Sequence, residues 1–223
     1  MAGRIGAANR VSSFELNIKR AILVNPKLET PNSKLGLFGG SFDPVHLGHL
    51  LVAQAACEEL GLDRLFFIPA AQSPFKPDAE PSPAAARLRF LRLALAGRTR
   101  FEIDDQEIHR GGVSYTVDTV RDYRRRFADA QLFWLIGADH VATLPQWRDA
   151  DELAQLVEFV AIPRPSEKAV PFPEPFRGRT LQGFPLGVSA SQIRARVKAG
   201  LPVDLLVGAA VAEAVRELGL YRK

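Results

Sequence analysis

Two histidines, His46 and His49, lie three residues apart in the segment GGSFDPVHLGH, which spans residues 39–49. The glycine pair that opens the segment lets the backbone turn sharply and come close to a ligand. A spacing of three residues places both imidazoles on one side of the first turn of a helix. That turn carries partial positive charge and free N–H groups, which suit phosphate. We therefore predict a phosphate site in which both rings donate N–H groups, and an anionic ligand would favour their protonated form.

A metal site is the second chemistry that two histidines can begin. Neither a third histidine nor an acidic residue is spaced to complete such a site, so we predict no metal held by protein ligands. The chain has one cysteine, Cys57, so an intramolecular disulfide and a cysteine-rich zinc site are both excluded. Cys57 lies among Ala and Leu and is interpreted as a small core residue.

Alternating strands and helices must position this segment. Apolar runs predict strands at residues 35–38, 65–69, 101–103, 131–136 and 157–162, and a shorter one at 180–184. Helix patterns occur at residues 13–24, 47–60, 84–96, 116–127, 189–199 and 207–218. This order predicts an α/β fold, a doubly wound parallel sheet with helices on both faces and a small helical portion at the C-terminus. In such sheets ligands bind at the carboxyl ends of the strands.

The chain of 223 residues is long enough for one sizeable core. Residues 1–34 are interpreted as an N-terminal extension, and residues 35–223 as the single domain. The net charge is +4, but basic and acidic residues are interspersed, which argues against nucleic acid as a partner. No stretch reaches the length of about 18 apolar residues expected of a membrane span. We predict a cytoplasmic protein without a membrane partner; a homo-oligomer is compatible with the sequence.

Residues 36–49 resemble the signature of the nucleotidylyltransferase superfamily, whose H-x-G-H element is matched by residues 46–49. Within it, residues 35–223 resemble the nicotinate-nucleotide adenylyltransferase family of bacteria. Four more segments carry this narrower likeness: 73–76 (SPFK), 114–116 (SYT), 136–139 (IGAD) followed by Trp147, and 188–194 (VSASQIR). Two positions depart from the family pattern: Phe75 stands where a histidine is frequent, and Ser191 replaces the usual threonine.

The resemblance implies a Rossmann-like fold and transfer of AMP from ATP to nicotinate mononucleotide, a step of NAD biosynthesis, with Mg²⁺ bound to the ATP phosphates. It implies that His49, His46 and Arg194 are catalytic. The residues expected to bind ATP are Gly39, Gly40, Ser41, Phe42, His46, His49, Gly137, Asp139, Ser189, Ser191 and Arg194. The residues expected to bind the mononucleotide are Lys76, Tyr115, Thr116 and Trp147.

Structural explanations compete with several of these roles. Ser189 and Asp139 both suit a helix cap, and Trp147 can be a core residue. Two other functions are alternatives to the implied reaction. A related transferase would use another acceptor, such as phosphopantetheine or nicotinamide mononucleotide, and a nucleotide-binding regulator would have lost catalysis.

Overall fold

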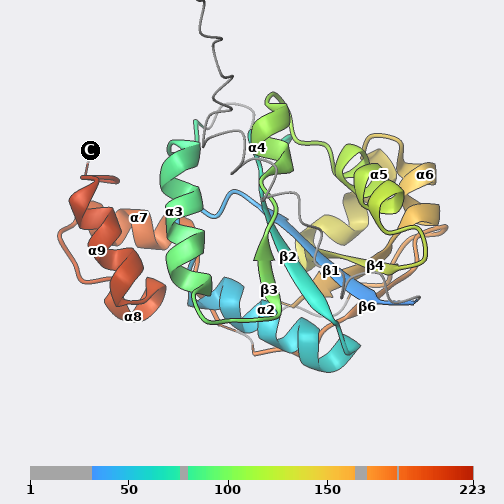
Figure 1. The fold of residues 1–223 in the computed structure, drawn as a ribbon, viewed down its shortest axis with the longest axis horizontal. Coiled ribbons are helices and arrows are strands. Elements are labelled where there is room, and N and C mark those ends of the chain that lie inside the picture. Colours follow the sequence, from blue (N-terminus) through green and yellow to red (C-terminus); the bar gives the residue numbers. More distant parts are fainter. Residues whose placement is uncertain (1–31, 76–79, 164–169, 185, 223) are drawn as a thin grey trace, which may run out of the picture. The chain divides into compact units, whose positions relative to one another are not determined.

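The computed structural model describes residues 32–75, 80–163, 170–184 and 186–222. Within these residues six strands form one parallel sheet in the order β3-β2-β1-β4-β5-β6 (Figure 1). The strands are β1 Lys34–Gly40, β2 Arg64–Pro69, β3 Phe101–Ile103, β4 Gln131–Gly137, β5 Glu158–Ile162 and β6 Gly178–Thr180. The predicted doubly wound α/β fold is therefore confirmed.

Helices cover both faces of this sheet, with α2 and α3 on one side and α5 and α6 on the other (Figure 1). The α-helices are α2 Leu47–Leu60, α3 Ala84–Leu95, α4 Gln106–Arg110, α5 Thr116–Arg126, α6 Ala150–Leu156, α7 Ala190–Lys198, α8 Asp204–Val207 and α9 Ala209–Glu217. A 3-10 helix, η2, follows β4 directly and spans Ala138–Gln146. The short helices α8 and α9 lie beside α2 and α3 respectively, so the C-terminal portion joins the main core.

Along the chain, strands are added first on one side of β1 and then, from β4 onward, on its other side. The chain moves outward from β1 through β2 to β3, then returns to place β4 on the other side of β1. The register pairs Phe38 of β1 with Leu135 of β4 near their carboxyl ends. Loops leaving two such strands diverge to opposite faces, and the crevice between them is the usual ligand site of this fold.

The central strands are apolar because they are covered on both faces. Leu35 and Leu37 of β1 are fully buried, and so are Leu65 and Phe67 of β2. Parallel strands that bury both faces read as continuous apolar runs rather than alternating ones. This pattern is why the sequence located the strands at residues 35–38, 65–69, 101–103, 131–136 and 157–162 to within two residues.

Several elements differ from the prediction. The helix expected at 207–218 is α9 at Ala209–Glu217, but the preceding helix α8 was not predicted; Gly208, with a φ of 86°, separates the two. The last strand is β6 at residues 178–180, before the range 180–184 that the sequence favoured. The helices α4, η2 and α6 were not predicted; η2 even contains a proline, Pro145. The helix expected at 13–24 lies outside the described residues.

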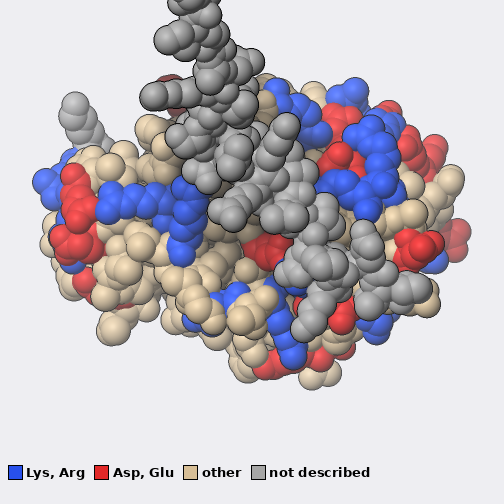
Figure 2. Space-filling model, viewed as in Figure 1, with Lys and Arg blue, Asp and Glu red and all other residues tan. Residues whose placement is uncertain are grey.

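Charged side chains are mixed on the surface. On the face shown in Figure 2, Lys and Arg lie beside Asp and Glu in several places, with uncharged surface between them. Many form pairs, such as Arg89 with Glu217 and Arg216 with Glu213. A search of the described helices for one that is long and apolar enough to traverse a bilayer finds none.

Candidate active site

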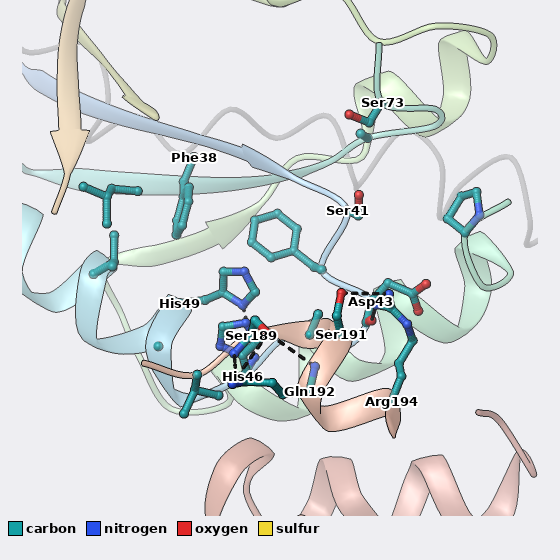
Figure 3. Close-up of a pocket in the computed structure, with 18 of the residues that line it drawn as sticks. Phe38, Ser41, Asp43, His46, His49, Ser73, Ser189, Ser191, Gln192 and Arg194 are labelled. Atoms are coloured by element: carbon teal, nitrogen blue, oxygen red, sulfur yellow. Dashed lines mark hydrogen bonds between the residues drawn. The ribbon is translucent and has the colours of Figure 1, made fainter. Parts of the chain in front are cut away.

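A cavity of about 690 Å³ opens at the carboxyl end of β1 (Figure 3). Its walls come from the loop before α2, the loop after β2, the end of β5, the start of α7 and the C-terminal end of the chain. The cavity brings together seven of the residues predicted to bind ATP: Ser41, Phe42, His46, His49, Ser189, Ser191 and Arg194.

The two histidines face each other across the first turn of α2. His46 is the residue before the helix and His49 occupies its third position. Their rings stack with centroids 3.7 Å apart, and the backbone N–H of His46 donates to Nδ1 of His49 over 3.2 Å. A ring nitrogen that accepts a hydrogen bond carries no proton, so neutral His49 has its proton on Nε2.

Neutral His46 also carries its proton on Nε2, but for a different reason. The side chain is 6 % exposed, and its Nδ1 is buried without a hydrogen-bond partner in the described part of the chain. A proton on that nitrogen would be a buried donor without an acceptor, which is costly. We therefore assign the proton of neutral His46 to Nε2 as well. Both rings then keep an Nε2–H group that can donate to a ligand.

Burial keeps both imidazoles neutral at neutral pH. It lowers the pKa of His46 from 6.5 to about 4. The pKa of His49 is also well below its usual value, first because of burial and second because of the nearby charge of protonated His46. A pair of rings this close cannot easily hold two positive charges. The ligand-free protein therefore presents neutral donors, and an anion is needed to favour protonation.

Packing around the histidines fixes their orientation. The rings of Phe38 and Phe42 lie against His49 with centroids 5.8 and 5.0 Å away. At Gly48, a Cβ atom would stand 3.1 Å from two atoms of the His46 ring, so any other residue would crowd the imidazole and displace it slightly. The spacing H-x-G-H thus has a steric basis in this fold.

The start of α7 forms the opposite wall. Ser189 is its N-cap: the hydroxyl accepts from the N–H of Gln192 at 3.3 Å, and the Gln192 side chain accepts from the N–H of Ser189 at 2.9 Å. The capping role that competed with phosphate binding is therefore realised in the structure. The first N–H groups of a helix have no partner inside it, and the first two residues of α7, Ala190 and Ser191, line the cavity.

Arg194 is held on the same helix with its guanidinium at the cavity. Its Nη1 donates to the backbone oxygen of Asp43 at 2.8 Å, and its Nη2 donates to the hydroxyl of Ser191 at 3.2 Å (Figure 3). The first contact links α7 to the loop before α2, and the second lies within α7. The cation therefore reaches the cavity from a fixed position, which suits a planar fork that binds phosphate oxygens.

Arg87 is a residue that the sequence analysis missed. It is 1 % exposed on α3, and its guanidinium donates to the backbone oxygens of Ser41, Ala70 and Ser82 at 2.8 to 3.0 Å. A buried cation with three carbonyl partners joins the loops that leave β1 and β2. The available signal was an arginine on the apolar face of a predicted helix.

A second, smaller cavity of about 210 Å³ lies beside η2 and the start of α5. It brings together Tyr115, Thr116 and Trp147, all predicted to bind the mononucleotide, and adds Phe75 and Arg148. The Phe75 and Trp147 rings have centroids 5.3 Å apart, and the Arg148 guanidinium stacks 4.7 Å above the ring of Tyr115. The cavity thus offers flat aromatic surfaces, one cation and the N-terminus of α5.

The segment Ser73–Phe75 borders both cavities. Ser73 lines the larger one, while Pro74 and Phe75 line the smaller one. The segment just before it is anchored by Ser114, whose hydroxyl accepts from the N–H of Ala71 at 2.9 Å and whose N–H donates to the oxygen of Gln72 at 2.9 Å. The two cavities are therefore neighbours along one anchored loop.

Some predicted residues lie elsewhere. Gly39 and Gly40 do not line the larger cavity; a Cβ at Gly39 would stand 2.8 Å from the Trp134 ring, so this glycine serves packing between β1 and β4. Gly137 is the last residue of β4 and Asp139 lies in η2; neither is among the residues lining either cavity. Lys76 lies outside the described residues.

Sequence comparisons find one matching family model, described as cytidylyltransferase-like, over residues 37–196. Among similar proteins, one from Opitutus terrae is 43 % identical over 192 residues, which cover 85 % of this chain and 98 % of that protein. One from Thermus thermophilus is 41 % identical over 194 residues, covering 85 % and 100 %. Both are named "Probable nicotinate-nucleotide adenylyltransferase".

Solved structures of the same fold include a Plasmodium falciparum nicotinic acid mononucleotide adenylyltransferase complexed with NaAD. It superposes with a TM-score of 0.70 at 16 % identity, covering 85 % of this chain and 98 % of that one. At this identity the likeness bears on the fold. It agrees with the parallel sheet covered by helices on both faces.

Proposed function

This chain belongs to the nicotinate-nucleotide adenylyltransferase family, within the cytidylyltransferase-like group, and from that premise we propose that it transfers AMP from ATP to nicotinate mononucleotide. The products are nicotinate adenine dinucleotide and pyrophosphate. The observation that carries the proposal is the pairing of two neighbouring cavities, one lined by phosphate donors and one by aromatic rings.

The larger cavity receives ATP. The Nε2–H groups of His46 and His49, the first N–H groups of α7 and the Arg194 guanidinium all border it. These groups converge on a space of about 690 Å³, which is within the usual size range of nucleotide-sized pockets. Positive helix ends and ring N–H donors together favour a polyphosphate in this cavity.

The smaller cavity receives the pyridine ring of the mononucleotide. Trp147, Tyr115 and Phe75 offer ring faces on which a pyridine can stack. Thr116 begins α5, so free N–H groups of that helix start are available to a carboxylate. The charge of Arg148 adds to this preference for an acid.

The reaction needs no covalent enzyme intermediate, because a phosphate oxygen of the mononucleotide is itself the nucleophile. That oxygen attacks the α-phosphorus of ATP; the new P–O bond forms as the bond to pyrophosphate breaks, and the bonding electrons leave with pyrophosphate. The protein holds the two substrates in line and stabilises charge on the transferring group. We assign the α-phosphate oxygens to His49, and the remaining ATP phosphates to His46, Arg194 and the start of α7.

Mg²⁺ enters as part of the ATP substrate. The described residues contain no group of three or more His, Cys, Asp or Glu side chains arranged to hold a metal. We infer an ion bound mostly by phosphate oxygens and water, which is the usual manner of Mg²⁺ with nucleotides. The bound ion neutralises part of the phosphate charge.

The test is pyrophosphate release from ATP with a panel of acceptors. We expect nicotinate mononucleotide to support the highest kcat/KM, nicotinamide mononucleotide a lower one and phosphopantetheine none. If activity is highest with phosphopantetheine, then phosphopantetheine is the acceptor and the proposed one is wrong. Binding of ATP without release of pyrophosphate in the presence of any acceptor would favour a regulator.

A further inference from the structure

The larger cavity contains a carboxylate where phosphate is expected. Asp43, in the loop before α2, is 8 % exposed and lines the cavity together with His46 and Arg194. A carboxylate that faced a polyphosphate would repel it. The structure must therefore compensate or redirect this charge.

Both carboxylate oxygens of Asp43 are occupied by donors. Oδ2 accepts from the backbone N–H of Ser82 at 3.0 Å, and Oδ1 accepts from the hydroxyl of Tyr221. The backbone oxygen of the same residue accepts from Arg194 at 2.8 Å. Asp43 is thus fixed at three points, by the segment before α3, by α7 and by the end of the chain.

Tyr221 is built into this position. It comes third from the end of the sequence, lines the cavity and adopts a φ of 64°, which is unusual for a residue other than glycine. Burial, followed by the hydrogen bond to Asp43, raises the pKa of its hydroxyl far above the usual value, so the hydroxyl stays protonated and remains the donor.

We propose that Tyr221 is a positioning residue of the ATP site: its hydroxyl turns the Asp43 carboxylate away from the phosphates and keeps the Asp43 backbone oxygen in place for Arg194. The C-terminal end of the chain is thereby part of the machinery that binds ATP. This inference rests on the proposed role of the larger cavity, and it adds a residue that contacts no substrate itself.

The test compares Tyr221→Phe with the unchanged protein. The variant keeps the ring and removes only the hydroxyl, so Oδ1 of Asp43 loses its donor and becomes free to turn towards the phosphates. We expect the dissociation constant and the KM for ATP to rise about tenfold, on the scale of a hydrogen bond to a charged group. The KM for nicotinate mononucleotide should stay the same, because Tyr221 does not line the smaller cavity.

Tyr123→Phe is the matched control. The Tyr123 hydroxyl also donates to a carboxylate, Oδ2 of Asp104 at 2.7 Å, but neither residue lines a cavity. It should lower the thermal midpoint and leave the KM for ATP unchanged. If Tyr221→Phe also affects only the thermal midpoint, Tyr221 has a merely structural role and the proposal is overturned.

A double-mutant cycle on ATP affinity separates positioning from packing. Once Asp43→Ala has removed the carboxylate, adding Tyr221→Phe should weaken ATP binding by much less than tenfold. An equal loss in both backgrounds would contradict the proposal. Because affinity is measured by calorimetry with ATP alone, the result holds even if the proposed acceptor proves wrong; failure of the proposed function appears separately, as absence of pyrophosphate release in the unchanged protein.

Discussion

At the scale of single residues, the stacked imidazoles illustrate how a buried environment selects a chemical state. Each ring keeps one N–H group for a ligand because its other nitrogen is either accepting a hydrogen bond or enclosed without a partner. Neutral donors near phosphate can gain positive charge as negative charge develops on the transferring group. The site therefore responds to the substrate instead of carrying fixed charges at these two positions.

Replacing His49 by alanine tests its assigned role. We expect kcat to fall by about 10² to 10³, the scale of losing one donor to a transition state. The assay is pyrophosphate release, with circular dichroism to show that the fold is retained. The control is His109→Ala, because the His109 side chain is 74 % exposed and does not line either cavity. Equal rates in both variants would remove His49 from the mechanism.

The pKa of His46 predicts an acid-sensitive stability. The unfolded chain binds a proton at this residue below pH 6.5, whereas the folded chain does so only near pH 4. The unfolded state therefore binds more protons in this window, and the free energy of unfolding falls as pH drops from about 6.5 to 4.

Urea unfolding at several pH values measures this slope. We expect His46→Asn to reduce this slope, because one of the two buried imidazoles whose pKa is lowered in the folded protein is gone. A slope that persists in full in the His46 variant would assign the acid sensitivity to other groups.

Arg148 is predicted to contribute to the choice of acceptor. Its guanidinium lines the smaller cavity and is also paired with Asp118 at 3.4 Å, so part of its charge is already compensated. We expect Arg148→Ala to lower the ratio of kcat/KM for nicotinate over nicotinamide mononucleotide about fivefold, on the scale of a half-exposed ion pair.

Arg125→Ala is the control for this selectivity. Arg125 lies on the same helix as Asp118, pairs with Asp122 and lines neither cavity. Its selectivity ratio should match that of the unchanged protein. If Arg148→Ala lowers kcat/KM equally for both mononucleotides, the side chain positions the ring of Tyr115 and does not recognise the nicotinate carboxylate.

At the scale of elements, β1 and β4 meet so closely that a side chain is excluded. Gly39→Ala would bring a methyl group to within 2.8 Å of the Trp134 ring. We expect a loss of about 1 to 3 kcal/mol in the free energy of unfolding, as is typical of overpacking. Adding Trp134→Phe should recover part of that loss, and thermal unfolding of the four combinations measures the coupling. Strict additivity would mean that the glycine is needed for another reason.

The sequence predicted those elements whose pattern is local. The strand before the glycine pair and the helix after it follow from an apolar run and from a glycine C-cap at Gly61, both visible without the fold. The helices α4 and α6 are too short, at five and seven residues, to show a helical period. The contact between Tyr221 and Asp43 could not be predicted for a related reason. The two residues are 178 positions apart, and only the fold brings them together.

The two histidines were predictable because one loop carries them. At Gly39 the structure adds a packing reason to the predicted one. The sequence favoured close approach of a ligand, which stays a prediction, and a Cβ atom there would meet the Trp134 ring. A glycine in the sequence indicates that another group lies close to the backbone, but it does not identify that group.

At the scale of the whole molecule, the described residues that line the two cavities lie between Phe38 and Tyr221. We expect a chain that begins at Asn32 to fold and to keep the kcat and both KM values of the full chain. Size-exclusion chromatography and the pyrophosphate assay provide the comparison. A marked loss of activity would show that the N-terminal extension takes part in catalysis.

The wall at Ser73–Phe75 has a consequence for turnover. The dinucleotide product joins an adenosine to a pyridine nucleoside, so it must straddle this wall with one end on each side. The adenosine part and the pyridine nucleoside part must both dissociate before the next reaction cycle can start. A bound dinucleotide would therefore occupy both substrate sites at once and exclude ATP and the mononucleotide together.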